Sequence, residues 1–376
     1  MAKLAFNSNA SHTLGVELEF GLIDSETGAL TSAIQPLLGR LPEPIRNWCK
    51  PELMQCCVEV ITDVCGDVDA VKADLTGKII LVEQAADELG VGLWWGSTHP
   101  FSRWRDQKIT PTERYEDLVN MLQEMARRLT TFGLHVHVGV DSGDKAVMIC
   151  DRIMQHLPTL LALTASSPFW EGRNTGLQSH RSKVMEGLPT AGLPTLMRNW
   201  SEYVWLVNHM VDTGFINTIR EIWWDVRPHH NFGTVEVRVC DMPGNLDDVL
   251  ALTALIQSLV AALSEEIDQG TYQHDCHPMM VRQNKWRAAR FGNRAELVNS
   301  YTHEVQAVPV IVERLVRRLE GTAKSLGCLS YLESAQGTAE RQGCSYSQTA
   351  LRDGGLGAAE MVKHLATASR LAPGRH

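Results

Sequence analysis

The chain has 376 residues, of which 44% are hydrophobic, and a formal net charge of -9. This length fits one large domain or two ordinary ones, and the hydrophobic content is typical of a globular protein. Acidic and basic residues are interspersed without a long basic run, which argues against a nucleic-acid partner and favours small-molecule substrates. The most apolar stretch, residues 249–263, is shorter than the ~20 residues that span a bilayer, so we expect a buried helix and no membrane partner.

The amino-terminal residues and the cysteines indicate a cytoplasmic protein. Residues 1–7 soon turn polar and lack the apolar segment of a secretory leader. Nine cysteines are an odd number with irregular spacing, and Cys56 and Cys57 are adjacent. This usage is typical of buried thiols in a reducing compartment and not of a disulfide framework.

Apolar patterning predicts the elements, because alternation marks strands and a spacing of three or four residues marks helices. In chain order we first expect a strand at 16–20 with a turn at 24–28, a strand at 52–60, a helix at 68–89 and a strand at 93–97. A helix from 112 to about 132 then precedes a strand at 134–138. Helices follow at 145–165, with a kink at Pro158, and at 195–210, and after them we expect a strand at 235–239 and a helix that begins at Asp247 or Asp248. The Gly-, Pro- and Ser-rich segment 166–192 predicts a long ordered loop that carries function. Without repeats or linkers, we predict a single α+β domain over 1–376, with 321–376 as a peripheral helical segment.

In three predicted strands, charged or metal-binding side chains stand two positions apart. The pairs are Glu17 with Glu19, His135 with His137, and Glu236 with Arg238. Successive strand side chains point to opposite faces, so the members of each pair share one face. One such strand is commonly an ordinary solvated face, but three together favour a single sheet whose polar face holds metal and phosphate.

The acids of this face predict a site for hard divalent ions. The carboxylates are Glu17, Glu19, Glu59 and Glu236, joined by one or two histidines. Such an oxygen-rich set suits Mg²⁺ or Mn²⁺ better than zinc, and two or more ions could bind. These ions neutralise triphosphate oxygens, while arginines stabilise a phosphoryl group in transfer. The candidate arginines are Arg173, Arg181, Arg227 and Arg238.

Each of these residues also has a structural interpretation. Glu59 could be a partly buried acid paired with an arginine, and His137 a core histidine bonded to a backbone carbonyl. Arg238 could be a plain partner of Glu236. The chain contains neither a P-loop nor a Gly-x-Gly-x-x-Gly motif after a strand, so any nucleotide needs another kind of binding site.

The order of these motifs resembles a known superfamily. Glu-x-Glu at 17–19, Gly-x-His-x-His at 133–137 and Glu-x-Arg with a following aspartate at 236–241 are similar to the metal-site strands of the glutamine synthetase superfamily. Four longer segments, 13–20, 167–177, 222–228 and 284–290, resemble the second bacterial type of glutamate–cysteine ligase. Its unassigned members are called YbdK-like carboxylate-amine ligases. The resemblance runs from about residue 11 to 320.

The resemblance implies a six-stranded saddle of largely antiparallel sheet, with helices on the convex face and ATP with Mg²⁺ in a funnel. It implies one ion held by Glu17, His135 and Glu236 near the nucleotide, and another held by Glu19 and Glu59 near the substrate carboxylate. Arg238 would stabilise the γ-phosphoryl group, and Arg181 or Arg227 would bind a substrate carboxylate or phosphate. The residues that it assigns to nucleotide binding are Arg173, His137, Asn284, Trp286 and Arg290.

The reaction that the resemblance implies is ATP-dependent amide formation. A carboxylate, such as the side chain of glutamate, becomes an acyl phosphate, and an amine, such as that of cysteine, displaces phosphate; activity on cysteine can be weak in this group. The chain lacks room for the amino-terminal domain of glutamine synthetase, so ammonia is not implied. Three alternatives stay open: an MgATP-binding sensor without turnover, a phosphotransferase that stops at the phosphorylated product, and a zinc hydrolase. A homodimer also stays open.

Overall fold

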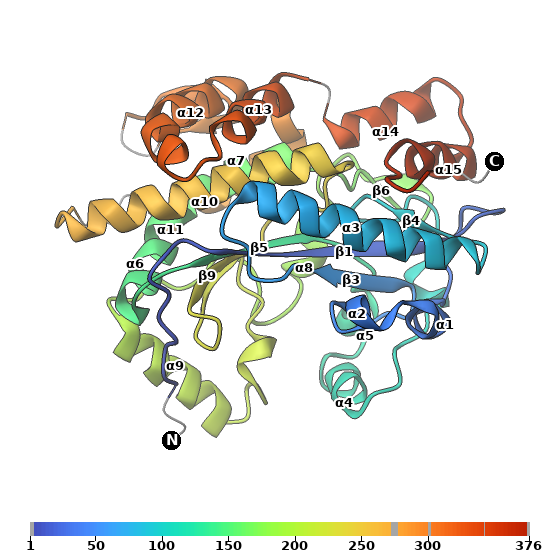
Figure 1. Ribbon diagram of the computed structural model, residues 1–376, viewed down its shortest axis with the longest axis horizontal. Helices are drawn as coiled ribbons and strands as arrows, with labels where there is room; N and C mark the ends of the chain where they lie inside the picture. Colours follow the sequence, from blue (N-terminus) through green and yellow to red (C-terminus); the bar gives the residue numbers. More distant parts are fainter. Residues whose placement is uncertain (1–3, 272–276, 300–301, 342, 374–376) are drawn as a thin grey trace.

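The centre of the fold is a seven-stranded sheet (Figure 1). The computed structural model describes residues 4–271, 277–299, 302–341 and 343–373. The strands follow the order β2-β3-β1-β5-β9-β8, and β4 also pairs with β1. Their bounds are β1 Leu14–Asp24, β2 Cys49–Pro51, β3 Cys57–Ile61, β4 Val91–Trp94, β5 Leu134–Gly139, β8 Val226–His229 and β9 Thr234–Val237. All pairings of these strands are antiparallel, as expected.

The central strand β1 explains why the sheet has seven strands where the resemblance implied six. It is 11 residues long, so its first part pairs with β5 and its last part, Gly21–Asp24, is left to pair with β4. Val16, Leu18 and Phe20 alternate along it and are fully buried. Their side chains fix the register, since a slip of one residue would exchange the apolar face for the acidic one.

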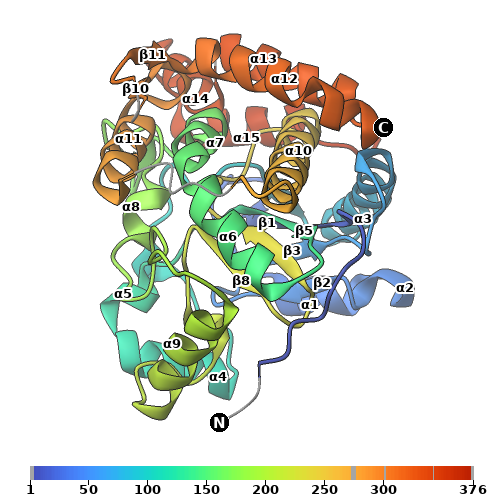
Figure 2. The same cartoon turned by 90° about the vertical axis from the view of Figure 1, so that its left-hand side faces the viewer.

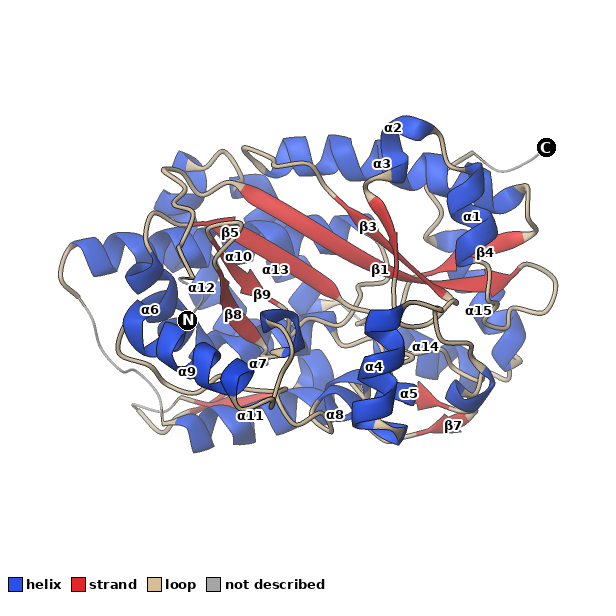
Figure 3. Ribbon diagram, turned by 90° about the horizontal axis from the view of Figure 1, so that it is seen from below, coloured by secondary structure: helices blue, strands red, loops and turns tan. Residues whose placement is uncertain are grey.

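Helices cover one face of this sheet and leave the other face to the charged and polar side chains. Figures 1 and 2 show α3 and α10 against the covered face, with α12 and α13 outside α10. Figure 3 looks onto the opposite face, where α4 and α9 flank the strands. The helices are α1 Ile34–Arg40, α2 Glu43–Arg46, α3 Val68–Asp87, α4 Glu113–Leu122, α5 Glu124–Arg127, α6 Gly143–Ile153, α7 Leu157–Thr164, α8 Arg181–Met185, α9 Trp200–Asp212, α10 Leu246–Asp268, α11 Pro278–Phe291, α12 Val308–Ser325, α13 Leu329–Glu340, α14 Cys344–Asp353 and α15 Ala358–Ala368.

Several predicted boundaries were wrong. The helix expected from 112 to 132 is two helices, because Gln123 between them has a φ of 49°. The kink expected at Pro158 within 145–165 is a full interruption: a 3₁₀ turn at Met154–His156 separates α6 from α7, and Pro158 stands in the first turn of α7, where its missing N–H costs nothing. The strand expected at 52–60 is confined to β3, and the neighbouring β2 was not predicted.

The apolar helix α10 is buried, as predicted, but longer than its apolar stretch suggested. It has 23 residues and is long and apolar enough to cross a membrane, yet 83% of its most apolar window is buried inside the structure. Asn245, and not Asp247 or Asp248, caps its start by accepting a hydrogen bond from the N–H of Asp248. Helix α10 is therefore a central helix of the hydrophobic core.

The carboxy-terminal helices belong to the same core. Leu319, Leu332 and Val362 are fully buried in the hydrophobic cluster that also contains the β1 side chains. The side chain of Gln348 donates a hydrogen bond of 2.8 Å to the carbonyl of Ser166, so α14 holds the segment 166–192. That segment is ordered, as predicted, and contains the hairpin of β6 (Phe169–Trp170) and β7 (Arg173–Asn174) and helix α8. This packing supports a single domain, which stays a prediction.

Candidate active site

The polar face of the sheet brings the predicted site residues into one row. Cross-strand register pairs Glu59 with Glu19, Glu17 with His135, and His137 with Glu236, which in turn pairs with Arg227. The row therefore crosses five strands on the face that Figure 3 shows. Residues far apart in the sequence meet because each strand places its polar side chains on the same side.

These residues line one cavity of about 400 Å³. The predicted residues in its wall are Glu17, Glu19, Glu59, His135, His137, Arg181, Arg227, Glu236 and Arg238. Residues of α4 and of the segment after α9 complete the wall, among them Tyr115 and Trp223. The side of the sheet that no helix layer covers is therefore walled by α4 and by the segment after α9, and the cavity between them is large enough for a small-molecule substrate.

Two groups of three side chains could each hold a metal ion. Glu17, Glu59 and His135 form one group, and Glu17, His137 and Glu236 form the other; within each group the ligand atoms lie within 4.8 Å of one another. The two carboxylate oxygens of Glu17 face different histidines, at 3.1 Å from His135 Nδ1 and 3.4 Å from His137 Nε2. Glu17 is thus common to both groups.

This grouping differs from the one that the resemblance implied. His137, which was assigned to the nucleotide, lies with Glu17 and Glu236 in the place expected for His135. Its Nε2 atom is buried without a hydrogen-bond partner and lies 3.7 Å from Glu236 Oε1, while its Nδ1 lies 2.9 Å from the hydroxyl of Thr234. A buried imidazole nitrogen that faces two carboxylates and has no protein hydrogen-bond partner is placed as a metal ligand, once deprotonated, needs to be, so the residues fit an ion.

Arginines and histidines keep two of the acids ionised. Burial raises the pKa of Glu17, but the neighbouring imidazoles of His135 and His137 outweigh burial and hold the pKa well below its usual range. Burial acts likewise on Glu236, where Arg227 and Arg238 lower the pKa well below the usual value. Both carboxylates are therefore charged at neutral pH.

The other acids repel one another. Burial, followed by the charge of Glu52, raises the pKa of Glu19 to about 7. The pKa of Glu59 is raised well above its usual value by burial and by the charges of Glu17 and Glu52. A divalent cation would relieve this repulsion, which is a second sign that the residues fit a metal.

Glu52 was missed by the sequence analysis. It lines the cavity, accepts a hydrogen bond of 3.4 Å from the hydroxyl of Tyr115, and has a raised pKa because of burial. Its signal was hidden, since the wrongly predicted strand 52–60 placed it in an ordinary alternating pattern.

The three arginines of the cavity have different environments. The guanidinium of Arg227 donates two hydrogen bonds to Glu236, from Nε to Oε2 at 2.7 Å and from Nη2 to Oε1 at 3.3 Å, and its Nη1 donates to the carbonyl of Ile222. Arg238 also donates to Glu236, and its side chain stays partly exposed in the cavity. Arg227 is thus a buried support, whereas Arg238 can still meet a ligand.

Arg181 is held by backbone carbonyls. Its guanidinium donates to the carbonyls of Val239 and Arg238 at 3.4 Å and lies against Gly133, where an added Cβ would stand 2.2 Å from Nη2. Only glycine leaves room for the guanidinium there. Arg181 therefore faces the cavity in a fixed position.

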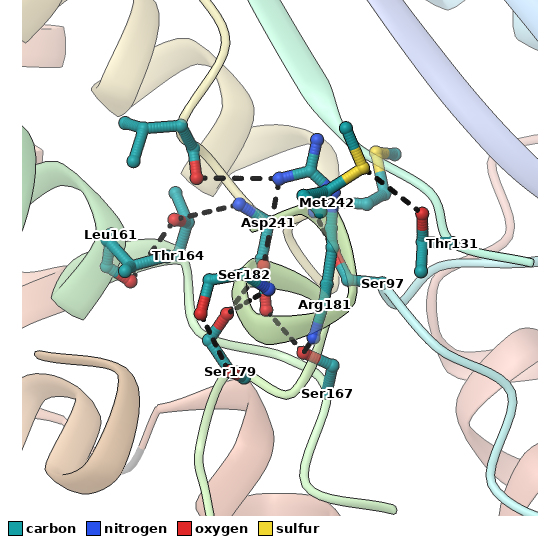
Figure 4. A network of polar contacts seen from close by, with 12 residues as sticks. Ser97, Thr131, Leu161, Thr164, Ser167, Ser179, Arg181, Ser182, Asp241 and Met242 are labelled. Carbon is teal, nitrogen blue, oxygen red and sulfur yellow. Dashed lines mark hydrogen bonds and ion pairs between the residues drawn. The ribbon is translucent and has the colours of Figure 1, made fainter. Parts of the chain in front are cut away.

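A buried carboxylate supports this arginine (Figure 4). Asp241 is fully buried and accepts hydrogen bonds from the N–H of Ser166 and from the hydroxyls of Ser167 and Ser179, at 3.0, 2.7 and 2.9 Å. Its Oδ1 lies 3.9 Å from Nη1 of Arg181. Asp241 thus ties the segment 166–179, and Arg181 just after it, to the chain that follows β9, the strand that carries Glu236.

Comparison with known proteins identifies the family. The family described as "Glutamate-cysteine ligase family 2 (GCS2)" matches residues 13–364. The chain belongs to glutamate–cysteine ligase family 2. The resemblance read from the sequence motifs is therefore confirmed.

Named relatives cover nearly the whole chain. A protein of Gloeobacter violaceus that carries the provisional name glutamate–cysteine ligase 2 is 43% identical over 92% of this chain and 95% of its own. One of Thermobifida fusca with the same provisional name is 40% identical over 88% of this chain and 84% of its own.

Solved structures share the fold at low identity. The glutamate–cysteine ligase of Francisella tularensis in complex with AMP has a TM-score of 0.73 at 12% identity and covers 97% of this chain and 90% of its own. A bifunctional glutathione synthetase of Pasteurella multocida has a TM-score of 0.72 at 14% identity, with 96% of this chain and 52% of its own covered. The glutamine synthetase-like α+β fold predicted from the sequence is confirmed.

Four residues assigned to nucleotide binding lie outside the cavity of this family member. Asn284 exchanges two hydrogen bonds with the backbone of Val298, and Trp286 is half exposed beneath Lys183. Arg290 lies over the ring of Phe291. Arg173 stands on β7 beside a different cavity. The structure does not bring these four residues to the polar row.

The segment around Asn284 supports the fold of the site instead. Lys285 is buried and forms ion pairs of 2.5 Å with Asp225 and 2.9 Å with Glu186. The backbone carbonyl of Asp225 accepts a hydrogen bond of 2.8 Å from the N–H of Arg238. Helix α11 therefore supports the site from behind, through the strand that presents Arg238.

Proposed function

We propose that this protein is an ATP-dependent ligase that joins a carboxylate to an amine through an acyl phosphate. The observation that carries the proposal is the row of acids, histidines and arginines in one cavity of a member of glutamate–cysteine ligase family 2. Glutamate and cysteine are the first substrates to test, because they are named by the family and its relatives. Nothing supports the alternative of a sensor without turnover.

We assign ATP and Mg²⁺, or Mn²⁺, as cofactors. The Francisella tularensis neighbour is described in complex with AMP, and the oxygen-rich groups that share Glu17 are of the kind that Mg²⁺ and Mn²⁺ use. Such ions would supply charge neutralisation of the triphosphate oxygens. His135, His137, Glu17, Glu59 and Glu236 would hold them, with Glu19 adjacent to Glu59 across the strands.

The arginines divide the remaining work. Arg238 keeps its positive charge, because Glu236 and Glu17 outweigh the effect of burial on its pKa, and its side chain can stabilise the phosphoryl group in transfer. Arg181 is fixed and faces the cavity, so it can bind the substrate carboxylate. The attacking oxygen is already a carboxylate, and a strong general base is unnecessary in the first step.

The setting of the reaction is also a proposal. Eight cysteines in the described part of the chain are free, and seven of them are buried; Cys276 lies outside the described residues. Free thiols suit a reducing compartment, so we propose the cytoplasm. The homodimer stays an open prediction, as does the absence of nucleic-acid and membrane partners.

Hydroxylamine trapping tests the reaction. The protein is incubated with Mg²⁺, ATP, glutamate and hydroxylamine, and hydroxamate and ADP are measured. We expect both products in the wild type, their loss when the metal is chelated, and a fall of at least about 100-fold in Glu19→Gln. The matched control is Glu26→Gln, an exposed acid outside the cavity, which should keep full activity. Binding of MgATP without ADP release, over a panel of carboxylates, would contradict a ligase.

A further inference from the structure

A second cavity lies beside the active site and shares none of its lining residues. It measures about 470 Å³ and is bounded by α5, the β6–β7 hairpin and the start of α8. Figure 3 shows α5 and β7 as neighbours. Its wall includes Trp104, Arg105, Arg128, Trp170, Arg173 and His180. The proposed ligase reaction uses none of these side chains.

The cavity has more positive than negative charge. Three arginines face two acids, Glu124 and Glu171, in its wall. Arg105 lies 3.5 Å from Glu171 and 4.1 Å above the ring of Trp104, whereas Arg128 and Arg173 form no ion pair with any described residue. Two guanidinium groups that form no ion pair, on one concave surface with a net positive charge, attract an anion.

Unpartnered polar atoms mark the same place. The Nε atom of Arg128 and both ring nitrogens of His180 are shielded from solvent and have no hydrogen-bond partner in the described structure. Burial, and then the charges of Arg128 and Arg173, lower the pKa of His180 to about 4. The neutral ring therefore offers one donor and one acceptor, and its side lies against Trp170 at 5.1 Å between ring centres. Buried polar groups without partners are costly unless a ligand or water satisfies them.

We infer that this second cavity binds a small organic anion. Its carboxylate or phosphate group lies between Arg128 and Arg173, and its flat or apolar part lies along Trp104 and Trp170. His180 supplies a neutral hydrogen bond to the same ligand. His180 directly precedes Arg181 in the chain, so a ligand that contacts His180 in the second cavity binds next to the arginine that faces the first cavity.

The test is calorimetric titration of the whole protein with two probes, benzoate and phenyl phosphate. Both carry a ring and an anionic group, and the stronger of the two identifies the carboxylate or the phosphate as the preferred anion. We expect saturable binding that weakens at least about tenfold in Arg128→Gln/Arg173→Gln. Binding should be unchanged in Arg238→Gln, the matched loss of one arginine from the first cavity.

The outcomes separate this inference from the ligase proposal. Thermal unfolding shows whether the double variant keeps its fold, and both of its arginines are at least partly exposed, so the exchange should be tolerated. The inference would be overturned if neither benzoate nor phenyl phosphate showed saturable binding. It would also be overturned if binding were lost in Arg238→Gln and kept in Arg128→Gln/Arg173→Gln. Neither result bears on hydroxamate formation, which depends on the first cavity.

Discussion

Asp241 shows how a single carboxylate can position an arginine that it barely touches. Three hydrogen bonds to its oxygens come from the segment 166–179, while Arg181 is 3.9 Å away. The pKa of Asp241 is raised by burial, although Arg181 and the N–H of Ser166 oppose this. The carboxylate therefore acts mainly as an acceptor that fastens the loop.

Asp241→Asn should disturb both stability and substrate binding. The side-chain NH₂ group of the asparagine would face N–H and hydroxyl groups that donate to the carboxylate in the wild type. We therefore expect the free energy of unfolding to fall by about 2 kcal/mol. Arg181 should lose its fixed position, and the KM for the carboxylate substrate should rise more than kcat falls. Urea unfolding and steady-state kinetics measure the two effects.

Ser179→Ala is the matched control for this change. It removes one of the three hydrogen bonds to the carboxylate, together with the 3.3 Å acceptor of the Ser182 N–H, and leaves in place both the carboxylate and the Ser167 hydroxyl that accepts the N–H of Arg181, so the loss should be only about 1 kcal/mol. Equal effects of the two variants on KM would show that Asp241 does not position Arg181.

At the scale of the element, the end of the segment before β5 is fitted to the guanidinium of Arg181. Gly133 accepts the N–H of Glu19 through its carbonyl and leaves no room for a side chain beside Nη2 of Arg181. A glycine here is required by close approach and not by backbone conformation.

Gly133→Ala should expel the guanidinium from its place. Arg181 is buried and bonded to carbonyls, so it cannot move aside freely, and we expect hydroxamate formation to fall by at least about tenfold. Gly77→Ala is the control, because Gly77 lies on the exposed side of α3 with open space around it. That change should instead stabilise the helix by about 0.5–1 kcal/mol. Unchanged activity in Gly133→Ala would show that the guanidinium has room to move.

The sequence predicted the elements whose patterns are complete within themselves. The strands around His135 and Glu236 were predicted to within two residues of their bounds, since each alternates over at least four residues, whereas the strand around Glu17 was predicted only for 16–20 and extends from Leu14 to Asp24. The break at Gln123 and the pairing of β4 with β1 were not predicted, because both depend on tertiary contacts that no local pattern reports.

At the scale of the whole molecule, the sequence predicted which acids meet but not how they are grouped. Periodicity shows that His135 and His137 share a face, but only the register between β1, β5 and β9 shows which histidine stands nearer to Glu236. Asn284, Trp286 and Arg290 were assigned by resemblance, and their distance from the cavity follows from the packing of α11.

The metal-free molecule should lose stability as the pH rises through neutrality. The pKa of Glu19 is about 7 in the folded protein, above its usual 4.5, so between these values the folded state holds a proton that the unfolded chain has released. The contribution of Glu19 to stability is therefore present below about pH 4.5 and lost as the pH approaches 7. Glu59 and Glu52 act in the same direction.

Urea unfolding of the metal-free wild type and Glu19→Gln between about pH 5 and pH 8 measures this effect. The variant should gain stability relative to the wild type as the pH rises, because it carries no titrating group at this position. Excess Mg²⁺ should stabilise the wild type more than the variant at the higher pH. A stability difference that does not change with pH would contradict the shifted pKa.

The hydrogen bond from Gln348 to Ser166 affects the order in which the site is assembled during synthesis of the chain. Synthesis begins at the amino terminus, so the strand with Glu17 leaves the ribosome before β8 and β9, and α14 follows only after α10 to α13. Until β8 and β9 are made, the repelling acids lack Arg227 and Arg238, and until α14 is made, the segment before Arg181 lacks the hydrogen bond from Gln348. A nascent chain therefore first displays an anionic half-site, and the segment that carries Arg181 is fastened by α14 only after every residue that lines the cavity has been made.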